Sequence, residues 1–196
     1  MIRVTLERYE VNFANEVAKV RTAENSQNHI YERDDLEPQP IAELNACCGE
    51  MAVAKSLNKY WSASGWRKDE HYQYRETVPD VGLNIEVRRV KRPDGRLSFR
   101  AHDVSHNRLL FLVYVHKADP SRIAATYVDI IGYIHALEAL PNATKYPNGY
   151  AIDQRYLHPY EGDRNVSEIA VMGTRRSTPE TPDLRPYGAA HPAHIG

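Results

Sequence analysis

The sequence has little cysteine, little excess charge of either sign and no long apolar run, and each shortage excludes a class of protein. Its only two cysteines, Cys47 and Cys48, are adjacent. Neighbouring residues of a helix do not face each other, so we expect two buried free thiols rather than a disulfide or a zinc site. This use of cysteine favours a reducing, cytoplasmic setting.

A formal net charge of −1 at pH 7 argues against a surface that is basic throughout, although a small basic groove fits the same total. No stretch is long and apolar enough to span a membrane, and the first residues do not resemble a signal peptide. We therefore expect no membrane partner.

The chain length of 196 residues fits one domain with an appendage. Residues 161–196 hold few large apolar side chains and four prolines. Such a composition cannot bury enough apolar surface to offset the entropy of ordering the chain. We expect a single folded domain over residues 1–160 and a flexible tail over residues 161–196.

Helical patterns come first along the chain, and strand patterns follow. Phe13, Val17 and Val20 form an apolar stripe at helical spacing, and Asn12 can cap that helix. This order predicts an α/β (α+β) fold with a mixed central β-sheet flanked by helices. The expected elements are a strand-like lead over 1–11, helices over 12–25 and 41–61, loops over 26–40 and 62–78 (the second with a short strand), strands over 83–91, 97–102, 109–115 and 127–134, and a short last strand over 149–152.

Two features of the strand series predict how the strands pair. Pro93-Asp94-Gly95 has turn chemistry, which predicts a hairpin between the strands at 83–91 and 97–102. The continuous apolar run at 109–115 predicts a central strand that is covered on both faces. Gly132 marks a bulge in the strand that follows.

Glu50 lies in the middle of the apolar face of the helix at 41–61, and Lys55 lies on the opposite side. An isolated carboxylate is costly to bury, so Glu50 needs a cation, several hydrogen-bond donors or a raised pKa. One interpretation is a functional site, which Gly49 favours by permitting another backbone to approach. The other is a glutamate paired with a core arginine or reaching the rim.

A second acidic group follows in the segment PDVGLNIEVRRV. On a strand, Glu86 and Arg88 point to the face opposite Val87. The plain interpretation is an edge strand with a solvated face. Asp80 would lie roughly 20 Å from Glu86 on a straight strand, so sharing an ion requires a bend at Gly82. Once folded back, the two carboxylates and the Val87 carbonyl offer hard oxygen ligands that suit Mg²⁺ or Mn²⁺.

With Glu50 on a preceding helix, this pattern resembles the PD-(D/E)XK phosphodiesterases, which include restriction endonucleases, λ-type exonucleases, Holliday-junction resolvases and small phage-encoded proteins. The resemblance covers residues 41–159. It implies a restriction-endonuclease-like core, a nucleic-acid substrate, which we expect to be DNA, and Mg²⁺ or Mn²⁺ as cofactor. It also implies catalysis by Glu50, Asp80, Glu86 and Arg88, with the ion held by the three acids and the Val87 carbonyl.

The sequence departs from the family at Arg88, which occupies the lysine position. A guanidinium does not give up its proton, but it can hold a phosphate in two-point contact and stabilise transition-state charge. Arg100, on a strand face with His102, is expected to bind substrate; Asp103 nearby is a secondary candidate. Arg67, in an aromatic-rich segment, is a second substrate-binding candidate. The alternatives are a solvated hairpin face and an aromatic core.

Three functions fit these residues. The first is a metal-dependent deoxyribonuclease. The second is a nuclease-fold protein that has lost catalysis and binds nucleic acid or protein in phage–host interaction. The third is a structural acid–arginine network in an unrelated interaction protein. The nuclease interpretation places the chain in the cytoplasm, that of the host cell if it is phage-encoded, and allows a homodimer.

Overall fold

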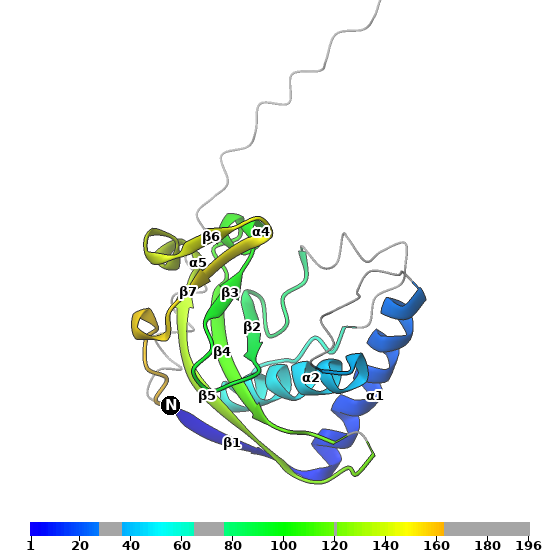
Figure 1. Cartoon of the computed structure of the whole chain (residues 1–196). Helices are drawn as coiled ribbons and strands as arrows, with labels where there is room; N and C mark the ends of the chain where they lie inside the picture. Colours follow the sequence, from blue (N-terminus) through cyan, green and yellow to red (C-terminus); the bar gives the residue numbers. More distant parts are fainter. Residues whose placement is uncertain (28–36, 65–76, 120, 163–196) are drawn as a thin grey trace, which may run out of the picture.

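The computed structural model describes residues 1–27, 37–64, 77–119 and 121–162 of the chain. It confirms an α+β fold with a mixed sheet flanked by helices (Figure 1). The elements, in chain order, are β1 (Ile2–Leu6), α1 (Arg8–Gln27), α2 (Gln39–Ser56), β2 (Ile85–Val90), β3 (Leu97–Phe99), α4 (Ala101–Ser105), β4 (Leu109–His116), β5 (Thr126–His135), α5 (Ala136–Ala139), β6 (Thr144–Tyr146) and β7 (Gly149–Ile152), with short 3₁₀ turns at Leu140–Asn142 and Gln154–Tyr156.

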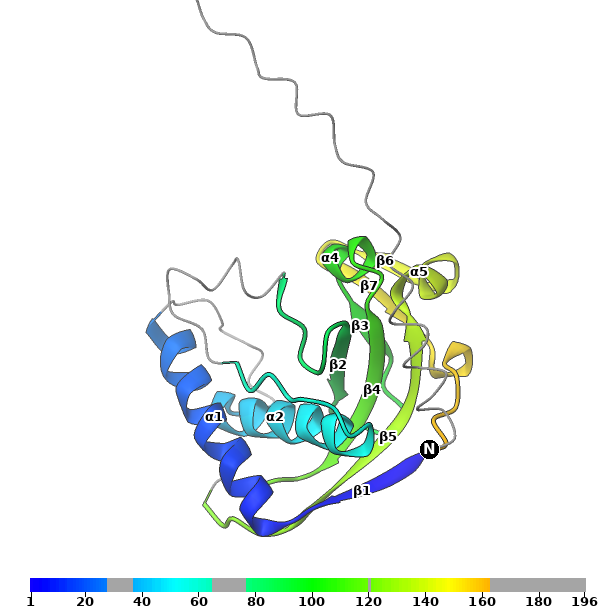
Figure 2. The same ribbon diagram turned by 180° about the vertical axis from the view of Figure 1, so that it is seen from behind.

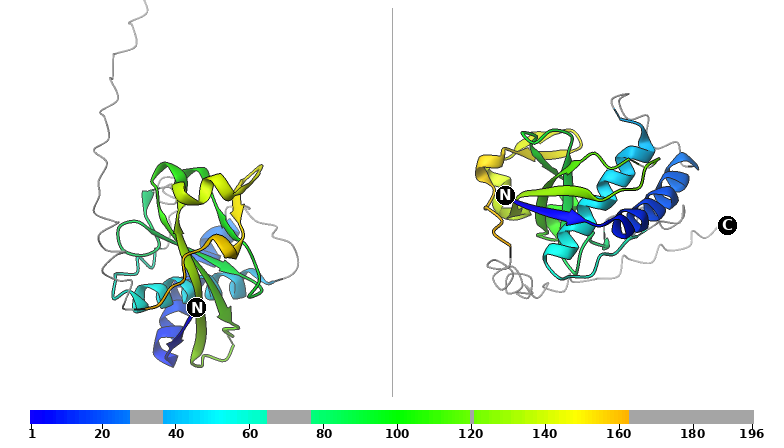
Figure 3. Two further views of the ribbon diagram at one scale, coloured as in Figure 1. Left: turned by 90° about the vertical axis from the view of Figure 1, so that its left-hand side faces the viewer. Right: turned by 90° about the horizontal axis from the view of Figure 1, so that it is seen from below.

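The main sheet has four strands in the order β1-β5-β4-β2. Strands β1, β5 and β4 are antiparallel neighbours, and β2 pairs with β4 in parallel. Helices α2 and α1 stack on one side of this sheet, with α2 against the strands (Figures 2 and 3). A second sheet, β3-β7-β6, gathers with α4 and α5 at the end of the molecule farther from α1 (Figure 1). The described strands thus leave one edge of β2 without a neighbouring strand in its sheet.

Strand β4 supplies side chains to two separate cores, which explains its continuous apolar run. Phe111 and Val113 belong to the core beneath α2, whereas Leu110 and Leu112 belong to the core shared with the second sheet. The prediction of a doubly covered central strand is therefore confirmed. A register shift opposite Gly132 also confirms the predicted bulge.

Gly49 lets α2 lie close to the sheet and so fixes the depth of the next residue, Glu50. A Cβ at Gly49 would lie 2.9 Å from Cγ2 of Val113, so the close neighbour is a side chain rather than the expected backbone. We expect Gly49→Val to lower the free energy of unfolding by about 1–3 kcal/mol through overpacking. Urea denaturation measures this loss. The matched variant Ala46→Val, at a half-buried site on α2, should lose less, and equal losses would contradict the packing argument.

The inward face of α1 differs from the predicted one. The buried apolar side chains are Val11, Ala14 and Ala18, beside buried Asn15 and Arg21. Of the predicted stripe, Val17 packs partly buried against the core, whereas Phe13 and Val20 are 54% and 50% exposed. Asn12 is not the cap, because α1 begins at Arg8. Small residues at the contact allow α1 to pack closely on α2. The prediction chose the stripe with the larger apolar side chains, and that choice was wrong.

The predicted hairpin between residues 83–91 and 97–102 is wrong. Strand β2 pairs with β4, and β3 pairs with β7 in the other sheet. Strand β3 ends at Phe99, because the chain turns into helix α4 at Ala101. A local turn at residues 93–95 therefore reverses the chain without pairing the two strands that it joins.

The remaining expectations have mixed outcomes. Helix α2 ends at Ser56 rather than Trp61, and β6 was not expected. Cys47 and Cys48 are buried free thiols as expected, and burial raises the pKa of Cys48 to about 12. Within the described ranges, no helix is both long and apolar enough to cross a bilayer. The predictions for residues 163–196 and for Arg67 lie outside the described residues.

Candidate metal and phosphodiester site

A tight reversal brings Asp80 back beside β2. Val81 and Ile85 exchange two backbone hydrogen bonds, of 3.1 and 3.2 Å, across a turn in which Gly82 has φ of 58°. This left-handed conformation favours glycine, so the predicted bend at Gly82 is confirmed. Extending that antiparallel register by one residue on each side sets Asp80 opposite Glu86. Asp80 and Glu86, six residues apart in the sequence, are therefore neighbours across the turn rather than far apart along one strand.

Asp80 sits at the edge of β2 that faces away from β4. Its Oδ2 atom accepts a hydrogen bond of 2.8 Å from the backbone N–H of Val87. The N–H and C=O groups of one strand residue point to the same side, so the Val87 carbonyl points toward this edge too. The predicted hard ligands, Asp80 and the Val87 carbonyl, thus share one edge of the sheet.

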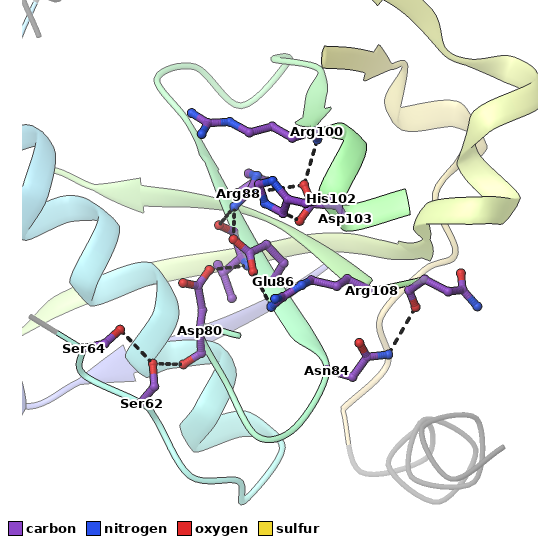
Figure 4. A network of polar contacts seen from close by, with 12 residues as sticks. Ser62, Ser64, Asp80, Asn84, Glu86, Arg88, Arg100, His102, Asp103 and Arg108 are labelled. Atoms are coloured by element: carbon purple, nitrogen blue, oxygen red, sulfur yellow. Dashed lines mark hydrogen bonds and ion pairs between the residues drawn. The ribbon is translucent and has the colours of Figure 1, made fainter. Parts of the chain in front are cut away.

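Glu86 and Arg88 project from the face of β2 opposite to that of Val87, as the alternation of side chains along a strand predicts. Nη1 of Arg88 lies 2.6 Å from Glu86 Oε1, and its Nη2 lies 2.9 Å from Asp103 Oδ2. Buried Arg108 donates to the other oxygen of Glu86 at 3.1 Å. Figure 4 shows Arg88 held between the two carboxylates, with Asp80 on the other side of Glu86. Nη1 of Arg88 also lies 3.4 Å from the Val87 carbonyl oxygen, so three acceptors hold the guanidinium.

Glu50 approaches from the α2 side and is held by buried donors. Its two oxygens accept hydrogen bonds of 2.8 and 2.9 Å from Arg21, and Trp61 Nε1 donates to Oε2 at 2.8 Å. One interpretation of Glu50 from the sequence was a pairing with a core arginine, and Arg21 is that arginine. Three of the roughly four acceptor positions of this carboxylate are occupied. Glu50 is thus better suited to act as a fixed negative charge than as a direct metal ligand.

Several of these residues line one cavity of about 690 Å³, bounded by α2, β2 and the β6–β7 hairpin. The sequence-predicted residues Glu50, Asp80, Glu86, Val87, Arg88 and Arg100 all line it. Arg100 reaches it differently from the expectation, because it caps the N-terminus of α4 and does not share a strand face with His102. Its side chain extends away from the carboxylate network (Figure 4).

The site is rich in negative charge around Asp80. Desolvation, together with repulsion from the Glu50 and Glu86 carboxylates, raises the pKa of Asp80 well above its ordinary value. Desolvation lowers the pKa of His102, because its effect is larger than the opposite effect of the nearby Asp103 and Glu86 carboxylates. The arrangement therefore favours a bound cation near Asp80 and a neutral imidazole at His102.

Sequence reasoning did not find four of the residues that shape the site: Arg21, Trp61, Arg108 and His102. No local pattern assigns Arg21 or Arg108 to a particular acid, because these contacts join distant segments. Asp103 carried a readable signal, since an acid three residues after a helix cap often accepts the cap N–H. Its Oδ2 accepts the Arg100 N–H at 2.8 Å.

The candidate site, then, combines Asp80 and the Val87 carbonyl at a sheet edge with Glu86 and a clamped Arg88 guanidinium on the adjacent face. The pairing of β2 with β4 and of β3 with β7 differs from the hairpin that the family resemblance led us to expect. Comparison of the chain with family models, with curated proteins and with solved structures finds no match in any of the three.

Proposed function

We propose that the chain is a metal-dependent phosphodiesterase, a deoxyribonuclease, that hydrolyses nucleic-acid phosphodiester bonds with Mg²⁺ or Mn²⁺ as cofactor. The observation that carries the proposal is the gathering of Asp80, Glu86, the Val87 carbonyl and Arg88 in one cavity with Glu50 behind them. Oxygen donors of this kind suit hard divalent cations, and the raised pKa of Asp80 marks an excess of negative charge that such a cation relieves.

The chain's own residues divide the chemical work. A bound divalent ion supplies positive charge that polarises a phosphate oxygen and lowers the pKa of water. Asp80, Glu86 and the Val87 carbonyl would hold it, and Glu50 adds a fixed negative charge. Arg88 stays protonated, so it holds and neutralises the phosphate but transfers no proton. Arg100 at the cavity wall adds a second cation for the nucleic-acid backbone.

The test uses the full purified chain with single- and double-stranded DNA, and with RNA for comparison. Cleavage is expected with Mg²⁺ or Mn²⁺ and should disappear in the presence of a chelator. A chain that binds these ions but cuts none of the substrates would contradict the phosphodiesterase proposal.

One observation favours a second function, a nuclease-like module that binds without cutting. Arg88 stands at the lysine position and is locked onto Glu86 and Asp103, and Glu50 is locked onto Arg21. Under this alternative the charges serve binding rather than proton transfer. A wild-type chain without activity, whose Arg88→Lys variant cuts DNA, would support it.

The two functions differ in the effect of substitutions at Arg88. If Arg88 acts by charge and position, Arg88→Lys should keep cleavage within about 10-fold of wild type, because the positive charge remains. Arg88→Met removes that charge and should lower the rate of cleavage about 100-fold or more. Single-turnover cleavage rates measure both. Exposed Arg92→Met is the matched control and should cleave at the wild-type rate.

A further inference from the structure

The start of α4 brings two further possible ligands toward Glu86. Glu86, His102 and Asp103 each offer one ligand atom, and these atoms all lie within 4.8 Å of one another. We propose that these three side chains form a second divalent-cation site, with nitrogen and oxygen ligands, that takes Zn²⁺ or Co²⁺ in preference to Mg²⁺. It differs from the oxygen site at Asp80 and the Val87 carbonyl, with which it shares only Glu86.

Asp103 supplies the first reason. Its side chain is 0% exposed, and its Oδ2 accepts hydrogen bonds from Arg88 and from the Arg100 N–H. No described residue donates a hydrogen bond to its other oxygen, Oδ1. Burying a carboxylate oxygen without a hydrogen-bond donor costs free energy. We therefore expect the partner of Asp103 Oδ1 to be a bound cation rather than a side chain.

His102 supplies the second reason. Its Nε2 atom lies 3.3 Å from Oδ1 of Asp103, yet the two are not oriented as a hydrogen bond. Two ligands on one zinc-like ion, each about 2.0–2.2 Å from it, lie roughly 3 Å apart. The pair thus has the spacing of a chelate. His102 is half-buried, so an ion can reach it from the cavity that it lines.

Glu86 can complete the set without losing its present contacts. Each of its oxygens accepts one guanidinium N–H, from Arg88 and from Arg108. A carboxylate oxygen has about two acceptor positions, so each oxygen keeps one for a cation. In two-metal sites, ions lie roughly 3.5–4 Å apart, a separation that one carboxylate spans.

The ligand types set the class of ion. Imidazole nitrogen suits zinc and its neighbours in the first transition series, whereas Mg²⁺ prefers oxygen and retains several waters. Arg88 opposes binding, because its guanidinium lies within hydrogen-bond distance of both Glu86 and Asp103. Removing the Arg88 charge should therefore raise the affinity of this site for the cation. If Arg88 served only as a structural ion-pair partner, its loss should lower that affinity.

The first experiment titrates the full chain with Co²⁺ and Zn²⁺ by calorimetry and records the visible absorption of bound Co²⁺. His102→Gln should weaken binding at this site at least about 10-fold and change the Co²⁺ spectrum. The chain has nine histidines, so the matched control is His106→Gln, exposed at the end of the same helix, which should behave as wild type. Unchanged Co²⁺ affinity and spectrum in His102→Gln would overturn the proposal.

A second comparison separates this inference from the proposed phosphodiesterase. Asp80→Asn should leave the His102-dependent Co²⁺ spectrum in place, because Asp80 is outside the set, while Arg88→Met should tighten Co²⁺ binding. Loss of the spectrum in Asp80→Asn, or weaker binding in Arg88→Met, would count against a separate site. A chain that binds Co²⁺ through His102 but cuts no nucleic acid would refute the phosphodiesterase and leave this inference standing.

Discussion

Arg21→Met is expected to lower the free energy of unfolding by about 3–5 kcal/mol, because it breaks a buried ion pair. Arg21 and Glu50 are only 7% and 6% exposed, and they share two hydrogen bonds. Removing the arginine leaves the glutamate buried without its counter-ion. Chemical denaturation of the metal-free chain, with circular dichroism as readout, measures the effect.

A second substitution shows whether that loss comes from the stranded charge. Adding Glu50→Gln to Arg21→Met removes the uncompensated carboxylate, while the glutamine oxygen can still accept the Trp61 N–H bond. Most of the lost stability should return. The matched surface variant is Lys19→Met, which breaks the exposed pair with Glu16 and should cost no more than about 0.5 kcal/mol. A double variant no more stable than Arg21→Met alone would show that burial of the charge is not the cause.

The same pair illustrates how far sequence reasoning can reach. The apolar face around Glu50 indicated that a carboxylate would be buried and would need a partner, and both statements are correct. The partner itself could not be predicted, because Arg21 lies 29 residues upstream on a helix whose buried face was assigned to Phe13 and Val20. Periodicity gives the faces of a helix, but packing of small residues decides which face turns inward.

The directions of Glu86 and Arg88 and the bend at Gly82 were easier to predict than the pairing of the strands around them. Alternation placed Glu86 and Arg88 on one face and Val87 on the other, and Gly82 identified the bend, because both follow from backbone geometry over a few residues. The pairing of β2 with β4 did not follow from local geometry. It joins residues more than twenty positions apart, and the turn at residues 93–95 is compatible with either pairing.

Helix α4 was missed for a related reason. Residues 97–102 alternate well enough to extend a strand, yet the chain turns at Arg100 so that Asp103 can accept its N–H. The prediction therefore placed His102 on a strand and considered Asp103 only as a secondary candidate. Five residues of helix give too short a pattern for periodicity to detect, so the capping acid was the one readable signal.

Asp80→Asn should reduce cleavage at least about 100-fold while leaving the metal-free fold as stable as wild type or more stable at neutral pH. The asparagine oxygen can still accept the Val87 N–H, so the hydrogen bond at the strand edge persists. The charge that repels Glu50 and Glu86 is gone. Thermal unfolding in a chelator across pH, together with cleavage rates in Mn²⁺, tests both halves.

The sign of the pH dependence follows from the raised pKa of Asp80. The folded chain holds this proton at pH values where the unfolded chain, with an aspartate pKa of about 3.9, has lost it. The contribution of Asp80 to stability therefore falls as pH rises from about 4 through the folded pKa. Asp80→Asn lacks this fall, so its advantage in chelator should grow with pH. Exposed Asp119, whose pKa is lowered by hydrogen bonds from Ser121, is the control, and Asp119→Asn should show no such gain.

Addition of Mn²⁺ should reverse the order of stability. A cation that binds only the folded chain stabilises it by mass action, about 2.7 kcal/mol at 100 times the dissociation constant. Wild type has the charged ligand and should gain this stabilisation, whereas Asp80→Asn should gain little. The wild-type chain is then the less stable of the two in chelator and the more stable in Mn²⁺. If Asp80 has only a structural role, the order of stability should not reverse. Wild type and Asp80→Asn should then keep the same order of stability with and without Mn²⁺.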